Sequence, residues 1–407
     1  MKKYICFILL ALVATCCLSS CEEVKGSPEE FQKKDKTVLV YMVANNDLSG
    51  NAITNFTDMQ KGYVPSEDGN LVVYYHYPNQ NPLLLNIYNN ESGMVAIDTV
   101  YRFPARNSAT PASLTSAINV TATYFPADEY GLILWSHATG WLPSGYYANN
   151  PKSDAGQFGH SLNGAFEDPY ADIVKMVKES DAGILSRSFG SEAGSEIDLK
   201  DLVKALPFKF SFVIFDACLM GGIEVAYQFK DSTDYILFSP TETLAAGMPY
   251  SSIMTHLFKT PSDLTAVAQE YFNYYNYQSY LKYATITLVK CSELDNVAAA
   301  AKEIYDAHRD KIPSLEINGI QKYYRSDKHW FYDLADFIDH IAEPSQAAAF
   351  KETLDKAVVY KAATPYFIGI PITKYSGLST YIPYYNEIEL DNYYKGLNWN
   401  IDCGMIQ

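Results

Sequence analysis

The chain contains few cysteines once its first residues are set aside. Four of its seven cysteines lie at or before residue 21, and the others are Cys218, Cys291 and Cys403, which are odd in number and widely spaced. This pattern has no paired metal-ligand spacing, and it excludes both a cysteine-rich zinc domain and a dense disulfide framework. A disulfide between Cys291 and Cys403 is compatible with the spacing and would leave Cys218 as a free thiol.

Basic residues are also scarce, and the sequence shows no internal repeat or low-complexity tract. The 407 residues include 31 Lys and Arg against 47 Asp and Glu, which gives a formal net charge of -16 at pH 7. Because binding to a phosphate backbone needs a basic surface, this balance argues against nucleic acid as a partner. The same negative charge is suited to attracting cationic substrates.

An apolar run opens the chain, but it is shorter than the length that a membrane-spanning helix needs. Two lysines precede the apolar residues 4–17, and a Leu-Ser-Ser-Cys sequence follows and ends at Cys21. This ending resembles the lipobox of bacterial lipoproteins, which implies cleavage before Cys21 and acylation of that cysteine; a plain secretory signal is the alternative. We therefore expect a signal peptide over residues 1–20, a flexible tether over residues 21–35, and a lipid-anchored protein at the outer membrane or cell surface.

Two apolar runs further along the chain each end on a residue that can do covalent chemistry. Residues 132–136 lead into His137, and residues 212–217 lead into Cys218. Each run has β-favouring residues followed by small or helix-opening ones, which predicts two buried strands of a parallel sheet. Because ligands bind at the carboxyl ends of the strands in open α/β sheets, we expect His137 and Cys218 to face one substrate. That is the layout of a cysteine hydrolase.

Strand-like and helical patterns alternate through the first part of the chain. Besides the two strands above, we expect strands at 37–43, 70–75, 83–88 and 235–238, and helices at 51–59, 111–124, 198–206 and 220–229. This alternation predicts a three-layer α/β/α fold with a mostly parallel sheet. The Gly- and Ser-interrupted stretch 142–195 is too long for an ordinary loop, and we expect a functional, mobile or processed insertion with one short helix at 168–179.

The pattern changes near residue 250. Helical patterns occur at 262–280, 293–308 and 347–359, and they surround a strand-like run at 284–289. Two short β-like runs follow at 366–372 and 378–383. We therefore divide the chain into a catalytic core over residues 36–249 and a partly helical C-terminal region over residues 250–407 that packs on the core.

Three sequence blocks carry a specific resemblance. Residues 135–141 (Trp-Ser-His-Ala-Thr-Gly-Trp), 215–220 (Phe-Asp-Ala-Cys-Leu-Met) and 223–227 (Ile-Glu-Val-Ala-Tyr) resemble the signature blocks of the clostripain family of cysteine peptidases. Residues 37–42 and 377–383 add supporting matches in the family's order, so the resemblance covers nearly the whole chain after the tether. It implies a caspase-like α/β fold and cleavage of peptide bonds after Arg or Lys in protein or peptide substrates.

The resemblance also implies roles for four residues. His137 and Cys218 would form the catalytic dyad, in which the thiolate is the nucleophile and the histidine assists its formation. Backbone N–H groups of Ala138 and Cys218 would hold the oxyanion, although the family usually has Gly where this chain has Ala138. Asp216 matches the position whose carboxylate pairs with substrate Arg or Lys, and strand alternation puts it on the same face as Cys218.

Processing, a metal and a second class of function complete the expectations. Family members are often made as zymogens, so Lys152 and Arg187 in the insertion are candidate processing sites. The sequence requires no cofactor; the resemblance makes calcium a candidate, and residues 45–47 (Asn-Asn-Asp) are either a calcium ligand group or an ordinary turn. The alternative to an active peptidase is a catalytically inactive relative that binds peptides or glycans. Ala138 and the 34 tyrosines are the features that favour this alternative.

Overall fold

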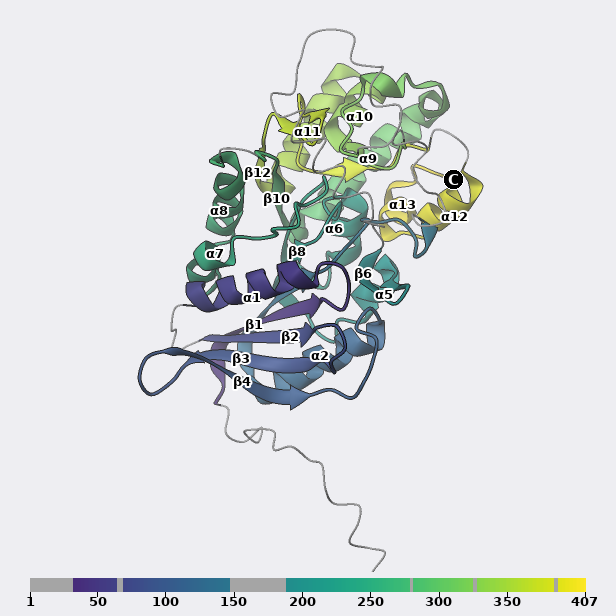
Figure 1. Cartoon of the computed structure of the whole chain (residues 1–407). Coiled ribbons are helices and arrows are strands. Elements are labelled where there is room, and N and C mark those ends of the chain that lie inside the picture. Colours follow the sequence, from purple (N-terminus) through teal and green to yellow (C-terminus); the bar gives the residue numbers. More distant parts are fainter. Residues whose placement is uncertain (1–31, 64–68, 147–187, 279–280, 325–327, 384–386) are drawn as a thin grey trace, which may run out of the picture.

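The computed structural model describes residues 32–63, 69–146, 188–278, 281–324, 328–383 and 387–407 (Figure 1). The predicted lipidation site Cys21, the predicted processing sites Lys152 and Arg187, and the predicted helix at 168–179 all lie outside these ranges. Within the described ranges, no helix combines the length and the apolar character that a membrane crossing needs.

A nine-stranded sheet forms the centre of the molecule, in the order β12-β10-β9-β8-β5-β1-β2-β3-β4. The five strands from β9 to β2 are parallel, and two antiparallel strands extend the sheet at each side. The prediction of a mostly parallel α/β sheet is confirmed. The strands are β1 (Lys34–Val43), β2 (Gly69–His76), β3 (Leu83–Asn89), β4 (Val95–Arg102), β5 (Ala127–Trp135), β8 (Phe210–Asp216), β9 (Thr233–Phe238), β10 (Thr285–Lys290) and β12 (Val358–Ala363).

The central strands carry continuous apolar runs because both faces of the sheet are covered there. In β1, Leu39 and Tyr41 enter the hydrophobic core on one face, whereas Val40 and Met42 enter the core on the other face. Each of these four side chains is at most 2% exposed. A strand in this position therefore shows a continuous apolar run instead of the alternation of a half-exposed strand.

Helices cover the two faces in separate layers. The first layer contains α1 (Ser49–Gly62), α7 (Tyr250–Leu257) and α8 (Leu264–Asn276), which pack in one core and lie close together in Figure 1. The opposite layer contains α2 (Pro111–Tyr124), α5 (Leu199–Lys204), α6 (Ile223–Phe229) and α9 (Leu294–His308), which pack in the other core. The predicted three-layer α/β/α architecture is thus confirmed.

Helix ends follow from side chains that satisfy the first backbone N–H groups. Thr110 caps α2 by accepting a hydrogen bond from the Ser113 N–H, and Pro111 occupies the first turn. Asp198 caps α5 and Asp263 caps α8 in the same way. These caps explain why the predicted start of the helix at 111 agrees with the structure.

The region after residue 250 belongs partly to the same sheet. It supplies β10 and β12, which pair antiparallel beside β9, and the helices α7 and α8. It also contains α9, already placed in the opposite layer, and the helices and short strands α10 (Leu334–Ile341), α11 (Pro344–Ala357), α12 (Ile388–Lys395), α13 (Asn398–Cys403), β11 (Tyr332–Asp333), β13 (Tyr366–Phe367), β14 (Ile370–Pro371) and β15 (Ser379–Thr380). The backbone N–H of Ser379 donates to the Gly221 carbonyl at 2.9 Å, so β15 adjoins the loop that follows β8.

Candidate active site

Two adjacent parallel strands bring the predicted dyad to one edge of the sheet. In the pairing of β5 with β8, Trp135 lies opposite Asp216, the last residue of β8. His137 follows Trp135 by two residues, and Cys218 follows Asp216 by two. Both residues therefore leave the sheet at the same level, at the carboxyl ends where an open α/β sheet binds its ligands.

His137 is held by its main chain and by its ring. Its side chain is buried, and its carbonyl accepts a hydrogen bond from the Gly190 N–H at 3.0 Å. Its Nε2 lies 2.8 Å from Oδ1 of Asp47, in the turn between β1 and α1. The neighbouring Ala138 is fully buried and is not among the described non-glycine residues with positive φ. An alanine methyl group is therefore tolerated at the position where the family usually has Gly.

Cys218 presents a partly exposed thiol in a constrained loop. Its Sγ lies 3.3 Å from the backbone N of Thr243 and 3.6 Å from the Thr243 carbonyl oxygen. The next residue, Leu219, is buried and has a φ of 62°, a left-handed conformation that is unfavourable for leucine. Its N–H donates to the Thr241 carbonyl at 2.8 Å. The loop after β9 thus holds the loop that carries Cys218 from one side, through one contact in which the sulfur accepts and one in which it donates.

The other two described cysteines are poor nucleophiles. Cys291 and Cys403 are free and buried, so the alternative of a disulfide between them is wrong. Burial raises the pKa of each thiol to about 12. Neither forms much thiolate near neutral pH, and Cys218 is the described cysteine with access to solvent.

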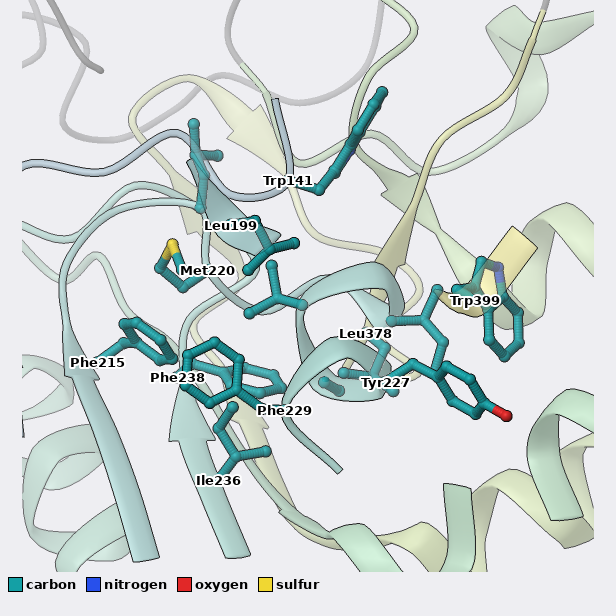
Figure 2. Packing of buried hydrophobic residues seen from close by; sticks show 14 of the residues in the cluster. Trp141, Leu199, Phe215, Met220, Tyr227, Phe229, Ile236, Phe238, Leu378 and Trp399 are labelled. Carbon is teal, nitrogen blue, oxygen red and sulfur yellow. The ribbon is translucent and has the colours of Figure 1, made fainter. Parts of the chain in front are cut away.

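Packed aromatic rings support the strand that carries the nucleophile. Phe215 on β8 lies 5.3 Å from Phe229 of α6 and 6.2 Å from Phe189, measured between ring centroids. Figure 2 shows Phe215, Phe229 and Phe238 gathered between the strands and α6, with Met220 above them. Closely packed rings of this kind restrict the motion of the Cys218 loop.

Gly140 lies where the loop that carries His137 contacts the loop that carries Cys218. It has a φ of 65°, and a Cβ built on it would lie 2.5 Å from the backbone oxygen of Leu219. We expect Gly140→Ala to destabilise the fold by about 3 kcal/mol, from the left-handed backbone and the clash together, and to reduce peptidase activity strongly. Gly93→Ala is the matched control, since Gly93 has a φ of 72° but nothing within 4 Å of its added Cβ. We expect it to cost about 1 kcal/mol and to leave activity unchanged; equal urea-unfolding curves for the two variants would contradict the contact.

Asp216 lies on the opposite side of the sheet from the α6 layer. Its Oδ2 accepts hydrogen bonds from the Met248 N–H at 3.1 Å and the Tyr250 hydroxyl at 2.9 Å. Burial raises the pKa of Asp216 to about 6, and the two hydrogen bonds oppose this rise. A Cβ on Gly247, which has a φ of 67°, would lie 2.8 Å from Oδ2, so only glycine leaves room for the carboxyl group. The Asp216 carboxyl group is therefore a hydrogen-bond acceptor with little access to water, at the end of the strand that leads to Cys218.

Residues 45–47 act as a turn that other parts of the site hold in place. The Asn46 side chain donates to the carbonyls of Val43 and Ser191, and its Oδ1 accepts the Leu48 N–H, each at 2.9 Å. Asn45 donates to Glu192 at 3.0 Å. No group of three or more His, Cys, Asp or Glu side chains in the described ranges is arranged to hold a metal ion. The turn interpretation therefore fits these contacts, and calcium as a cofactor stays a prediction.

Glu192 is a site residue that sequence reasoning missed. It is buried on β6 (Phe189–Glu192) and accepts from the Ser108 N–H at 2.7 Å, with His76 Nδ1 at 3.1 Å. Burial acts to raise its pKa, but hydrogen bonds from His76 and Asn45 outweigh this, and the pKa is lowered. Glu192 stays ionised and joins β6 to the Asn45 turn. A lone glutamate in a Gly- and Ser-rich stretch carries no pattern by which this role could be found.

Comparison with known proteins agrees with this geometry. The sequence pattern of the clostripain family matches residues 40–154 and 181–403. The chain belongs to the clostripain family of cysteine peptidases. It is 24% identical to clostripain of Hathewaya histolytica in an alignment of 265 residues that covers 59% of this chain and only 45% of that protein. The chain therefore spans less than half of that curated relative.

Solved structures of clostripain-family proteases share the fold. An inactive zymogen from Parabacteroides distasonis superimposes with a TM-score of 0.74 at 30% identity, covering 91% of this chain and 99% of that one. A secreted protease from Bacteroides thetaiotaomicron, bound to an irreversible peptide inhibitor, gives a TM-score of 0.73 at 25% identity with the same coverage. The clostripain-family and caspase-like predictions are confirmed.

Proposed function

We propose that this chain is a cysteine endopeptidase that cleaves peptide bonds after Arg or Lys with a Cys218–His137 dyad. The observation that carries the proposal is the register of β5 and β8, which delivers a histidine and a partly exposed free thiol to one sheet edge. Family membership makes a cysteine-peptidase reaction the chemistry to expect there. The related protease bound to an irreversible peptide inhibitor supports a peptide as the substrate.

The reaction follows from the groups at the sheet edge. His137 takes the Sγ proton, and the resulting thiolate attacks the carbonyl carbon of the scissile bond. Backbone N–H groups of Ala138 and Cys218 stabilise the negative oxygen of the tetrahedral intermediate. The C–N bond then breaks, and His137 gives its proton to the leaving amine. Water, deprotonated by His137, hydrolyses the thioester and restores the Cys218 thiol.

Asp216 supplies the preference for basic residues in this proposal. Its carboxylate is buried at the end of β8, the strand that leads to Cys218, and a charge-assisted contact with a guanidinium or ammonium group is stronger there than in water. A substrate cation favours the ionised form of a carboxyl group whose pKa is raised to about 6, so binding and ionisation of Asp216 support each other. The net charge of -16 favours the approach of cationic peptides.

A panel of fluorogenic peptides tests the proposal. The purified full-length chain, before and after limited nicking with trypsin that is then inhibited, is given peptides with Arg, Lys, Ala or Asp before the scissile bond. We expect turnover of the Arg and Lys peptides. Turnover confined to Ala or Asp would keep the peptidase and discard the role of Asp216. Complete inactivity of both preparations would favour the inactive relative that binds peptides or glycans.

Processing is a separate part of the proposal. We place activating cleavage after Lys152 or Arg187, two basic residues outside the described ranges. The related zymogen from Parabacteroides distasonis supports this expectation. N-terminal sequencing of the active protein should find a new terminus at residue 153 or 188, and a fully active uncut chain would exclude the processing step.

The membrane anchor rests on the sequence ending at Cys21, by analogy with lipoproteins. We place the protein at the outer membrane or cell surface, where its peptide substrates are extracellular or periplasmic. Fractionation of cells that express the chain should find it with membranes, whereas Cys21→Ser should release it or leave it unprocessed. An unaltered distribution of the Cys21→Ser variant would argue for a plain secretory signal.

A further inference from the structure

Asp47 contacts the ring of His137 from the turn between β1 and α1, which is remote from His137 in sequence. The distance from His137 Nε2 to Asp47 Oδ1 is 2.8 Å, within hydrogen-bond range. The histidine side chain is 5% exposed, whereas that of Asp47 is 56% exposed. The carboxylate therefore lies on the solvent side of the ring. Because an ionised carboxylate only accepts hydrogen bonds, the contact requires the proton on Nε2.

Strand β6 fixes both partners of this contact. The Gly190 N–H donates to the His137 carbonyl at 3.0 Å. On the same strand, the Ser191 carbonyl accepts from the Asn46 side chain at 2.9 Å, beside Asp47. Three neighbouring β6 residues thus join the histidine loop to the 45–47 turn, since Glu192 also binds Asn45. An exposed ion pair between a histidine and a carboxylate on an independently mobile loop would contribute little free energy. Here β6 holds both residues, so the Asp47–His137 geometry is set before substrate binds.

We propose that Asp47 is a positioning residue for His137, which holds the proton on Nε2 so that Nδ1 exchanges a proton with the Cys218 sulfur. The inference rests on the proposed peptidase function, which it deepens by adding a third member to the dyad. After the Sγ proton moves to Nδ1, both ring nitrogens carry a proton. The Asp47 carboxylate then faces an imidazolium and stabilises it, and the same contact restores the ring orientation when Nδ1 protonates the leaving amine.

Three variants test this role in the full-length chain. Asp47→Ala removes both the acceptor and the charge, and we expect kcat to fall about 10- to 100-fold with KM changed less than about threefold. Asp47→Asn keeps an acceptor oxygen and should lose less. Asp58→Ala is the control, because Asp58 is a carboxylate on α1 that pairs with Lys61; we expect it to retain the original kcat. Because Asp47 is solvent-accessible, added formate should restore part of the activity of Asp47→Ala, whereas chloride at equal ionic strength should not.

A spectroscopic readout separates this inference from the peptidase function. Imidazole 15N NMR of the full-length chain, with the His137 signals identified by their loss in His137→Ala, reports which nitrogen carries the proton. We expect Nε2–H in the original chain and loss of that preference in Asp47→Ala, whether or not any peptide is cleaved. An Nδ1–H tautomer in the original chain, or unchanged kcat in Asp47→Ala of an active enzyme, would overturn the positioning role. Absence of peptide cleavage with the expected tautomer would instead overturn the proposed function alone.

Discussion

Cys218→Ala is expected to reduce kcat on Arg and Lys peptides by at least about a thousandfold, because an alanine methyl group cannot form the thioester intermediate. The structure supports this expectation by elimination among the described cysteines. Cys291 and Cys403 are buried, with pKa values raised to about 12, and neither can present a thiolate to a peptide. Initial rates measured with saturating peptide would give the effect directly.

Cys291→Ala is the matched control for this loss. It also removes a thiol and the same number of atoms, but from a buried position at the end of β10. We expect it to cost about 1 kcal/mol of stability and to leave kcat within about twofold of the original value. Equal loss of activity in both variants, with both still folded by circular dichroism, would show that Cys218 is not the nucleophile.

Asp216→Asn is expected to weaken the preference for basic residues and to raise the stability of the fold. The buried carboxylate is the proposed partner of the substrate cation, so its neutralisation should lower kcat/KM for Arg and Lys peptides by about a hundredfold, which corresponds to about 3 kcal/mol. Rates on any peptide with a neutral residue before the bond should change far less. A uniform decrease for all peptides would indicate a structural role for Asp216 in place of a specificity role.

The stability effect of the same substitution follows from burial, which raises the pKa of Asp216 from 3.8 to about 6. Between these values the folded chain holds the proton more tightly than the unfolded chain, so this group's contribution to stability falls as pH rises through the interval and stays low above it. Asp216→Asn should therefore stabilise the fold by up to about 3 kcal/mol at pH 7.5 and by almost nothing below pH 4. Urea unfolding of both proteins at pH 7.5 and below pH 4 measures the change in the free energy of unfolding. An equal change at the two pH values would contradict this role of burial.

Strong local patterns allowed much of the sheet and its helices to be predicted. The apolar strands at 37–43 and 70–75 correspond to β1 and β2, and the helix at 111–124 corresponds to α2 with the same bounds. In these segments the local preference and the tertiary environment agree: a continuous apolar run is buried on both faces, and Thr110 with Pro111 begins the helix.

Other predictions failed where distant contacts decide the conformation. The helix predicted at 347–359 ends at Ala357, because Val358–Ala363 pairs with β10 as an edge strand. The helix predicted from residue 220 begins at Ile223, since the backbone at Leu219 is left-handed and the chain is still turning. Strand β4 was not predicted, although its alternating exposed and covered residues are typical of an edge strand. Helices α7, α10, α12 and α13 were also missed.

The candidate site shows the same division between local and distant information. His137 and Cys218 could be placed at one sheet edge because each follows its own apolar strand directly. The contact between Asp47 and His137 joins residues 90 positions apart, and Glu192 reaches the same turn from the end of the predicted insertion. Neither contact has a sequence period or a spacing that could reveal it, so both became visible only in the folded chain.

Covalent labelling tests the central claim, that Cys218 is the nucleophile of a peptidase selective for basic residues. The full-length chain, before and after trypsin nicking, is treated with a peptidyl acyloxymethyl ketone ending in Lys, whose carboxylate leaving group a cysteine thiolate displaces to form a thioether. Intact mass and peptide mapping then locate the adduct. We expect one adduct per chain, on Cys218, and much slower labelling by the same reagent ending in Asp. An adduct on Cys291 or Cys403, or equal labelling by both reagents, would contradict the claim.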